Sequence, residues 1–137
     1  MIIDAHSHLW LKQDAVVDGQ PIQTLPTNGS RSIFFGEEVQ MLPPFMIDGI
    51  NSAEIFLSNM DYAQVGGAVV VQEVIDGNQN SYLAEVQRKY ANRFCCLGMA
   101  DSIQDVDRIM EIGVKGISIP GHRLLGTSLL NKMPLFK

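Results

Sequence analysis

The sequence predicts an α/β fold of parallel βα units, and three observations support this prediction. Four short apolar runs are typical of buried strands; they cover residues 2–5, 68–72, 94–99 and 114–119. The segments between the last three runs have the apolar spacing of helices. A parallel partner strand is reached only through a crossover connection, which is right-handed. The 137 residues, 46% of them hydrophobic, suffice for one packed domain.

Helices are expected before or between the later strands, with serines at their starts and glycines at their ends. Apolar residues recur at helical intervals in two segments, first at Leu83, Val86 and Tyr90, and then at Ile103, Val106, Ile109 and Met110. Ser52 and Ser102 are suitable N-caps. Gly66 and Gly113 stand where a helix would end before the next strand. The predicted order is strand, long insert, helix, strand, helix, strand, helix, strand.

The insert after the first strand, at about residues 9–51, is long for a βα connection. It contains four prolines and several glycines, and residues 15–23 around Asp18-Gly19 predict a small β-hairpin. Long connections in compact domains are usually functional or disordered. Because this one leaves the end of a strand, we expect a lid or a pocket wall.

Composition excludes several classes of partner. The net charge is −5, and the basic residues are spread singly, so no basic stripe could neutralise phosphates. No apolar run approaches the roughly 18 residues that span a bilayer, and the start lacks the pattern of a signal peptide. We therefore expect a cytoplasmic protein that binds neither nucleic acid nor a membrane. Cys95 and Cys96 are expected to be reduced core residues that face opposite sides of a strand.

The residues with most chemical information are the histidines that end the first strand. A period of two places Asp4, His6 and His8 on one face of an extended strand. Two imidazoles with this spacing, at the carboxyl end of a parallel strand, can chelate one divalent ion. The alternative is a pair of hydrogen-bonded polar residues at a strand end.

Further polar residues follow the other strands. Gln72 and Glu73 come after the second strand and Asp101 after the third, so that each could face the same edge of the sheet. His122 and Arg123 follow the fourth strand, where they could hold a substrate carboxylate; His122 could instead add a third metal ligand. Solvated loop positions, or a helix cap for Asp101, are the alternatives. Trp10 could line an apolar pocket or pack in the core.

Several segments together resemble one family. The apolar strand ending in His6-x-His8 at the N-terminus resembles the first-strand signature of the amidohydrolase superfamily. Four later segments, at residues 59–72, 80–82, 92–94 and 113–117, look like its amidohydrolase-2 branch in order and spacing. The resemblance covers nearly the whole chain. It implies that the sequence forms the first four strands of a (β/α)8 barrel, within residues 1–137.

The resemblance also implies an activity. The branch includes lactonases of sugar acids and related cyclic esters, and decarboxylases of the aminocarboxymuconate semialdehyde type. His6 and His8 would hold a divalent ion, with zinc expected, while His122, Arg123, Gln72 and Trp10 would contact the substrate. Asp101 is a weak candidate for the general base. Some lactonases of the branch are thought to dispense with the metal.

The chain departs from the family in length. A full barrel needs about 250 residues, and the family's further metal-binding His from strand five and Asp from strand eight have no position in the 137 residues. Four strands expose two edges, which invite pairing. We expect a hydrolase completed by association, either of two copies or with a complementary C-terminal half-barrel chain. The alternatives are a non-catalytic or truncated half-barrel, a decarboxylase, or an open sheet with helices on both faces.

Overall fold

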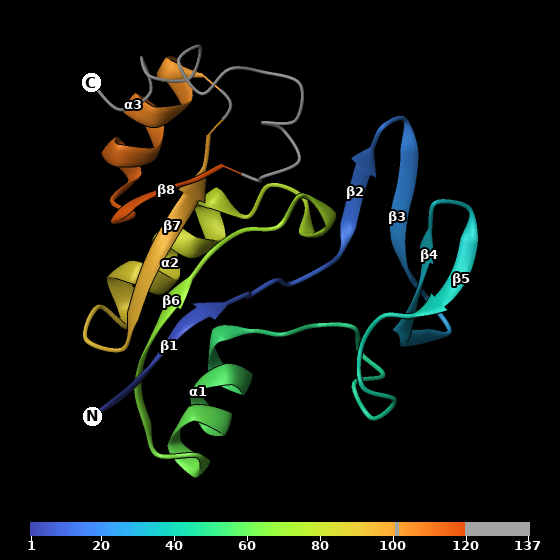
Figure 1. The fold of residues 1–137 in the computed structure, drawn as a ribbon, viewed down its shortest axis with the longest axis horizontal. Coiled ribbons are helices and arrows are strands. Elements are labelled where there is room, and N and C mark those ends of the chain that lie inside the picture. Colours follow the sequence, from blue (N-terminus) through green and yellow to red (C-terminus); the bar gives the residue numbers. More distant parts are fainter. Residues whose placement is uncertain (101, 120–137) are drawn as a thin grey trace.

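The parallel sheet has the predicted strand order. The computed structural model describes residues 1–100 and 102–119. Its parallel sheet is ordered β1-β6-β7-β8, with every neighbouring pair parallel (Figure 1). The strands are β1 (Ile2–Ser7), β6 (Val65–Val70), β7 (Phe94–Met99) and β8 (Gly116–Ser118). Strand order along the sheet follows chain order, as in the wall of a (β/α)8 barrel. The fold is therefore α/β and corresponds to part of such a barrel.

Each helix connects two successive strands of this sheet or leads into one. The helices are α1 (Ala53–Tyr62), α2 (Asn80–Lys89) and α3 (Ile103–Ile112), and a short 3₁₀ turn, η1 (Val74–Asp76), follows β6. Among the described residues, no helix is long and apolar enough to cross a membrane.

The helix caps agree with the sequence at three positions and differ at one. The Ser52 and Ser102 hydroxyls accept hydrogen bonds from the backbone N–H groups of their first turns. Gly113 ends α3 in the left-handed conformation, with φ at 95°. The prediction for Gly66 is wrong, because Gly66 lies within β6 and Gln64 takes the positive φ, at 58°.

All three helices cover the same face of the sheet. Phe94 and Cys96 of β7 share one core cluster with Met60 of α1, Leu83 of α2 and Ile109 of α3. Side chains alternate along the strand, so Cys96 is buried while Cys95 is exposed, and both are free thiols. This confirms the predicted opposite orientation of the two cysteines, while the prediction that Cys95 lies in the core is wrong because its side chain is on the uncovered face. The alternative with helices on both faces is wrong, since the strands lie in chain order and residues of α1, α2 and α3 join the same core cluster.

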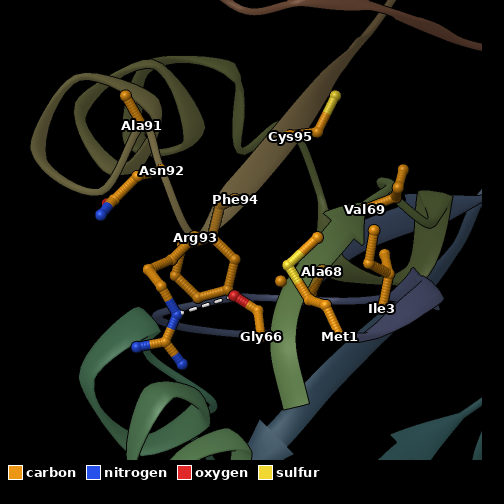
Figure 2. Close-up of a pocket in the computed structure, with 11 residues that line it drawn as sticks. Met1, Ile3, Gly66, Ala68, Val69, Ala91, Asn92, Arg93, Phe94 and Cys95 are labelled. Carbon is orange, nitrogen blue, oxygen red and sulfur yellow. Dashed lines mark hydrogen bonds between the residues drawn. The ribbon is translucent and has the colours of Figure 1, made fainter.

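The opposite face of the sheet is open. Ile2 and Ile3 of the edge strand β1 are 60% and 54% exposed, so the prediction that this first strand is buried is wrong. An open groove of about 240 Å³ lies against this face near the amino ends of the strands (Figure 2). Met1, Ile3, Val69 and Cys95 are among the residues that line it. Apolar strand residues here have no covering layer among the described residues, as expected for the inner face of an unclosed barrel.

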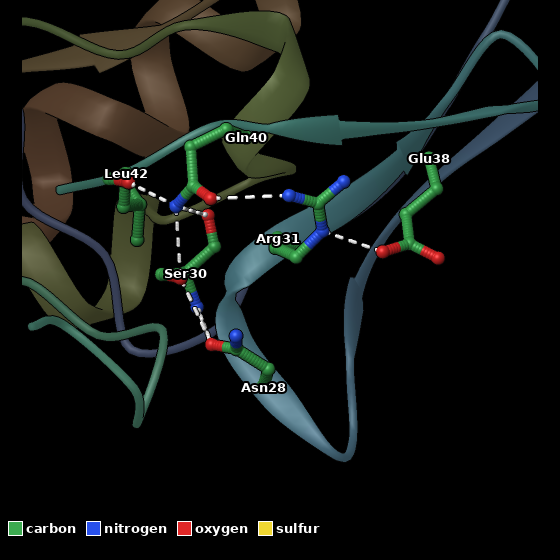
Figure 3. Close-up of polar contacts among 6 residues, drawn as sticks. All are labelled: Asn28, Ser30, Arg31, Glu38, Gln40 and Leu42. Atoms are coloured by element: carbon green, nitrogen blue, oxygen red, sulfur yellow. Dashed lines mark hydrogen bonds and ion pairs between the residues drawn. The ribbon is translucent and has the colours of Figure 1, made fainter. Parts of the chain in front are cut away.

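The insert is a folded antiparallel sheet. Its strands are β2 (Asp14–Val17), β3 (Gln20–Leu25), β4 (Asn28–Phe34) and β5 (Glu37–Gln40), paired in sequential order. The predicted hairpin is β2–β3, with Asp18 and Gly19 at φ values of 51° and 77°, which suit a tight two-residue turn. The pairing of β4 with β5 was not predicted. It is supported by Arg31, whose guanidinium donates to Glu38 and Gln40 (Figure 3).

Hydrogen bonds close the base of the insert and join it to the turn after β6. Trp10 and Asn51 exchange backbone hydrogen bonds of 3.1 and 3.0 Å, and the Trp10 indole N–H donates to the Gly49 carbonyl at 2.9 Å. The side-chain amide of Gln13 donates to the Asp76 carboxylate at 3.0 Å. The Gln13–Asp76 contact joins the insert to the turn that follows β6.

Candidate metal centre

Three potential metal ligands meet at the carboxyl ends of β1 and β6. They are His6, His8 and Glu73, and their ligand atoms all lie within 4.8 Å of one another. The His6 and His8 rings stand edge to face with centroids 4.8 Å apart. The His8 Nε2 is 3.8 Å from the Glu73 Oε1, too far for a hydrogen bond. Carboxyl ends of parallel strands are where barrel enzymes place their chemistry.

A register shift in β1 separates the two histidines from Asp4. Asp4 pairs with Ala68 and Ser7 pairs with Val70, so β1 advances by three residues where β6 advances by two. Ala68 and Val70 are both in the helix-covered core. Asp4 and Ser7 therefore face the helices. The prediction that Asp4 shares a face with the histidines is wrong, because one extra residue inverts the alternation.

The Asp4 side chain instead supports the local backbone. Its Oδ1 accepts a hydrogen bond of 3.0 Å from the His6 backbone N–H. The buried Ser7 hydroxyl donates to the Val69 carbonyl at 3.0 Å, which fixes β1 to β6 between the two histidines. The irregular segment is thus held on both sides. It presents His6 and His8 away from the helices.

The contacts of His8 leave one ring nitrogen free for a metal. Its Nδ1 lies 3.1 Å from the Val71 carbonyl oxygen. A carbonyl can only accept, so the Nδ1 carries the proton and donates, and the Nε2 keeps its lone pair. Metal-binding histidines characteristically donate their second N–H to a backbone carbonyl or carboxylate in this way. The tautomer and the orientation of His8 therefore fit a ligand.

The spacing of the three groups also fits one ion after a small movement. Two ligands about 2.0–2.1 Å from a tetrahedral zinc lie roughly 3.4 Å apart. The His8–Glu73 separation of 3.8 Å is close to this value, and the largest separation of the cluster is 4.8 Å. His6 and Glu73 are exposed, and side-chain rotations that bring ligand atoms from 4.8 Å to about 3.4 Å apart are small for such residues. A His₂-carboxylate set is a known donor set for zinc.

A buried carboxyl lies beside this cluster. Asp76, in η1, is 3% exposed and accepts a hydrogen bond from Gln13. Burial raises the pKa of Asp76, opposed by the Gln13 hydrogen bond and by the nearby His8. Among the described residues, the Gln13 Oε1 has no hydrogen-bond partner. No sequence signal marks Asp76, because a single acid in a polar turn is indistinguishable from a solvated one.

Replacing Asp76 by asparagine is expected to stabilise the protein at pH 7. A raised folded-state pKa means that the folded state holds its proton more tightly, so wild-type stability falls as pH rises from the unfolded pKa through the folded pKa. The substituted asparagine carries no charge at any pH, and its amide N–H can donate to the unpaired Gln13 Oε1. Urea unfolding at pH 7 should show a gain above the 0.5 kcal/mol or so typical of surface changes.

The same comparison at about pH 3, where Asp76 is protonated, should show a smaller difference between the two proteins. Asp107→Asn, on the exposed face of α3, is the matched control and should change stability little at either pH. A gain that is equal at both pH values would contradict the assignment to the buried charge.

Two of the predicted substrate-binding residues have structural contacts instead. The buried Gln72 amide donates to Asn80 and to the Leu97 carbonyl, and its oxygen accepts from the Gln79 backbone N–H. Trp10 is buried, with its indole N–H bonded to Gly49. Their polar groups are therefore hydrogen-bonded within the protein, and their predicted contact with a substrate stays a prediction.

The remaining predicted site residues are not placed. Asp101, His122 and Arg123 lie outside the described residues, so their predicted roles stay predictions. Glu73, which the sequence offered only as one of several polar strand-end residues, is brought to the histidines.

The chain matches one family model over most of its length. The model described as Amidohydrolase matches residues 3–130. Among solved structures, the chain is similar to a probable 2-pyrone-4,6-dicarboxylic acid hydrolase from Acinetobacter baumannii, crystallised with citric acid bound. The sequence identity is 16% and the TM-score 0.52, and the match covers 85% of this chain and 36% of that chain. A search of curated proteins found no match.

At this identity, the likeness to the hydrolase shows a shared fold. The family model covers far more than half of the chain and begins at the strand that carries the histidine pair. The chain belongs to the amidohydrolase family.

Proposed function

We propose that this chain acts as a metal-dependent hydrolase of a small, anionic cyclic ester or amide. The observation that carries the proposal is the contact of the His8 Nδ1 with the Val71 carbonyl, which leaves the Nε2 free and directed toward the cluster with Glu73. An exposed pair of solvated histidines would need no such second contact. The arrangement supports a metal ligand fixed in tautomer and orientation.

In this proposal His6 and His8 hold the ion, with zinc as the expected metal. When bound, such an ion supplies a Lewis acid that polarises a carbonyl and lowers the pKa of water. The rest of the site comes from the chain itself. The Val71 carbonyl orients His8, and Asp4 and Ser7 hold the irregular strand that presents both rings. The general base is not found among the described residues, and Asp101 remains the candidate outside them.

The substrate class rests on two considerations. The similar solved structure is named as a hydrolase of 2-pyrone-4,6-dicarboxylic acid, which is a cyclic ester with two carboxylates. A divalent ion held by two neutral imidazoles keeps its positive charge, which attracts anions. Both favour an anionic lactone over a neutral one.

We also propose that the chain associates through the edges of its parallel sheet. The edge strand β1 exposes Ile2 and Ile3 beside an apolar groove. Unpaired edges and apolar faces of this kind favour pairing with further strands. The partner would be a second copy or a chain that supplies the remaining strands of a barrel, and native mass spectrometry would distinguish them by mass.

The second candidate is a non-catalytic half-barrel, and a decarboxylase of the same branch is the third. Among the described residues no layer covers the inner face of the sheet, and this favours the non-catalytic form, because exclusion of water strengthens electrostatic catalysis. The hydrolase and the non-catalytic form differ in turnover. They do not differ in metal binding.

The test is hydrolysis of 2-pyrone-4,6-dicarboxylate by the purified chain loaded with zinc. We expect the ring absorbance to fall with time, and this loss should stop when a chelator removes the metal. Unsubstituted 2-pyrone should react at least about 10-fold more slowly, since losing one carboxylate contact worth about 1.4 kcal/mol lowers the rate tenfold. Release of carbon dioxide in place of ring opening would favour the decarboxylase. Bound metal without turnover of either compound would favour the non-catalytic half-barrel and would contradict the hydrolase proposal.

A further inference from the structure

We propose that Glu73 is the third protein ligand of the ion held by His6 and His8, so that the chain binds the metal with its own residues. This inference rests on the proposed function, because it concerns the same ion. It goes beyond the histidine pair, since it assigns a carboxylate ligand to the loop after β6. The site would then be complete as a binding site without a ligand from later strands.

The backbone on the N-terminal side of Glu73 is fixed to β1. The Val71 backbone N–H donates to the Ser7 carbonyl at 2.9 Å, and the Val71 carbonyl accepts from the His8 ring at 3.1 Å. Val71 therefore bonds to two successive residues of the histidine segment, Ser7 and His8. This contact places the end of β6, and with it Glu73, against His8.

The neighbouring residues also orient the Glu73 side chain. Gln72 is buried, and its amide is bonded to α2 and β7 on the helix side of the loop. Glu73 has an extended backbone, with φ −101° and ψ 147°, so its side chain leaves in the opposite direction from that of Gln72. On the other side, the Asp76 N–H donates to the Glu73 carbonyl at 3.2 Å and closes η1. Glu73 is thus held at both ends and directed at the histidines.

The three side chains His6, His8 and Glu73 form a donor set that occurs in known metal sites. Two imidazoles and one carboxylate form the donor set of several zinc hydrolases and of facial iron(II) sites, and leave positions open for water and substrate. Two neutral ligands and one anion leave a single net positive charge on a bound divalent ion. This charge suits an anionic substrate better than a site with several carboxylates would.

The competing explanation is a surface ion pair between His8 and Glu73. With side-chain exposures of 27% and 49%, such a pair contributes only about 0–1 kcal/mol. It predicts no role for Glu73 in metal affinity. The two explanations therefore separate in a binding experiment.

The experiment measures zinc affinity of the full chain by chelator competition, with cobalt(II) absorption as a report on coordination. Wild type should bind one ion per chain. Glu73→Gln should weaken binding about 100-fold or more, because loss of even an outer-shell partner costs about 10–100-fold. It should also change the cobalt spectrum. Glu73→Asp, which keeps a carboxylate, should lose less zinc affinity than Glu73→Gln.

Glu37→Gln is the matched control, because Glu37 is an exposed glutamate on β5, in the insert sheet. Its affinity should equal that of wild type, and circular dichroism should show all variants folded. Wild-type affinity and an unchanged cobalt spectrum in Glu73→Gln would overturn this inference while the proposed function stands. If Glu37→Gln lost as much zinc affinity as Glu73→Gln, the change in net charge alone would explain the effect, and this inference would also be overturned. Failure of the wild-type chain to bind metal would contradict both this inference and the proposed function.

Discussion

Replacing His8 by alanine is expected to abolish divalent-ion binding, and this is the largest effect we expect at the candidate metal centre. The change removes a ligand nitrogen and also the hydrogen bond to the Val71 carbonyl that joins the two strand ends. The loss of affinity should exceed the roughly 10–100-fold that follows removal of an outer-shell partner. Equilibrium dialysis with elemental analysis would measure it, with His6→Ala expected to behave alike.

Lys12→Ala is the control for this prediction. Lys12, like His8, lies between β1 and β2. Its side chain is 70% exposed, and its ammonium forms a surface ion pair with Asp14. Its removal should leave one ion per chain. Because His8 is only partly buried, the free energy of unfolding of the His8→Ala protein should fall by no more than the roughly 0.5–1.5 kcal/mol that one hydrogen bond contributes. Retention of a full equivalent of metal by folded His8→Ala would disprove the assignment of His8 as a ligand.

The parallel sheet and its helices could be predicted because their signals are local. Apolar runs, helical spacing and the caps at Ser52, Ser102 and Gly113 each act within a few residues. The second hairpin of the insert has no such signal. Its strand β4 buries Ser30 and Ser32, whose polar side chains hide the alternation that marks a strand. Ser30 is accommodated through hydrogen bonds with nearby Asn28 and with Gln40 on the partner strand.

The exposure of β1 shows a different limit. The apolarity of Ile2 and Ile3 indicates that these residues are suited to burial, but it does not identify what buries them. In the described residues they form an edge beside an uncovered face. The sequence pattern therefore predicted the strand correctly and its surroundings wrongly.

The candidate metal centre could be predicted only in part, because only one of its features is local in the sequence. The spacing of His6 and His8 is local, and it indicated a chelating pair. The register shift that turns Asp4 away depends on pairing with β6, and the approach of Glu73 depends on the contacts of Val71 and Gln72. Both are tertiary effects, which no period within the first strand contains.

Leu83→Ala is expected to cause the largest loss of folding stability that we predict. Leu83 lies on α2, is fully buried, and packs in the one core cluster that all three helices share with the sheet. Truncation of a buried leucine costs about 2–5 kcal/mol, the sum of lost burial and the remaining cavity. Urea unfolding followed by circular dichroism would measure the change. Leu11→Ala, at a position that is 49% exposed, is the control and should cost far less.

The same variant tests whether the metal centre depends on the core or only on the strand ends. The hydrogen bonds that position His6 and His8 lie within β1, β6 and the following turn. Gln72, which orients Glu73, is bonded to Asn80 at the start of α2, but none of these hydrogen bonds involves the Leu83 side chain. Folded Leu83→Ala should therefore bind zinc with wild-type affinity. Zinc at about 100 times its Kd should then add about 2.7 kcal/mol of stability to either protein, because only the folded state binds. A zinc-induced gain in wild type that is absent in folded Leu83→Ala would show that α2 packing shapes the centre, contrary to this prediction.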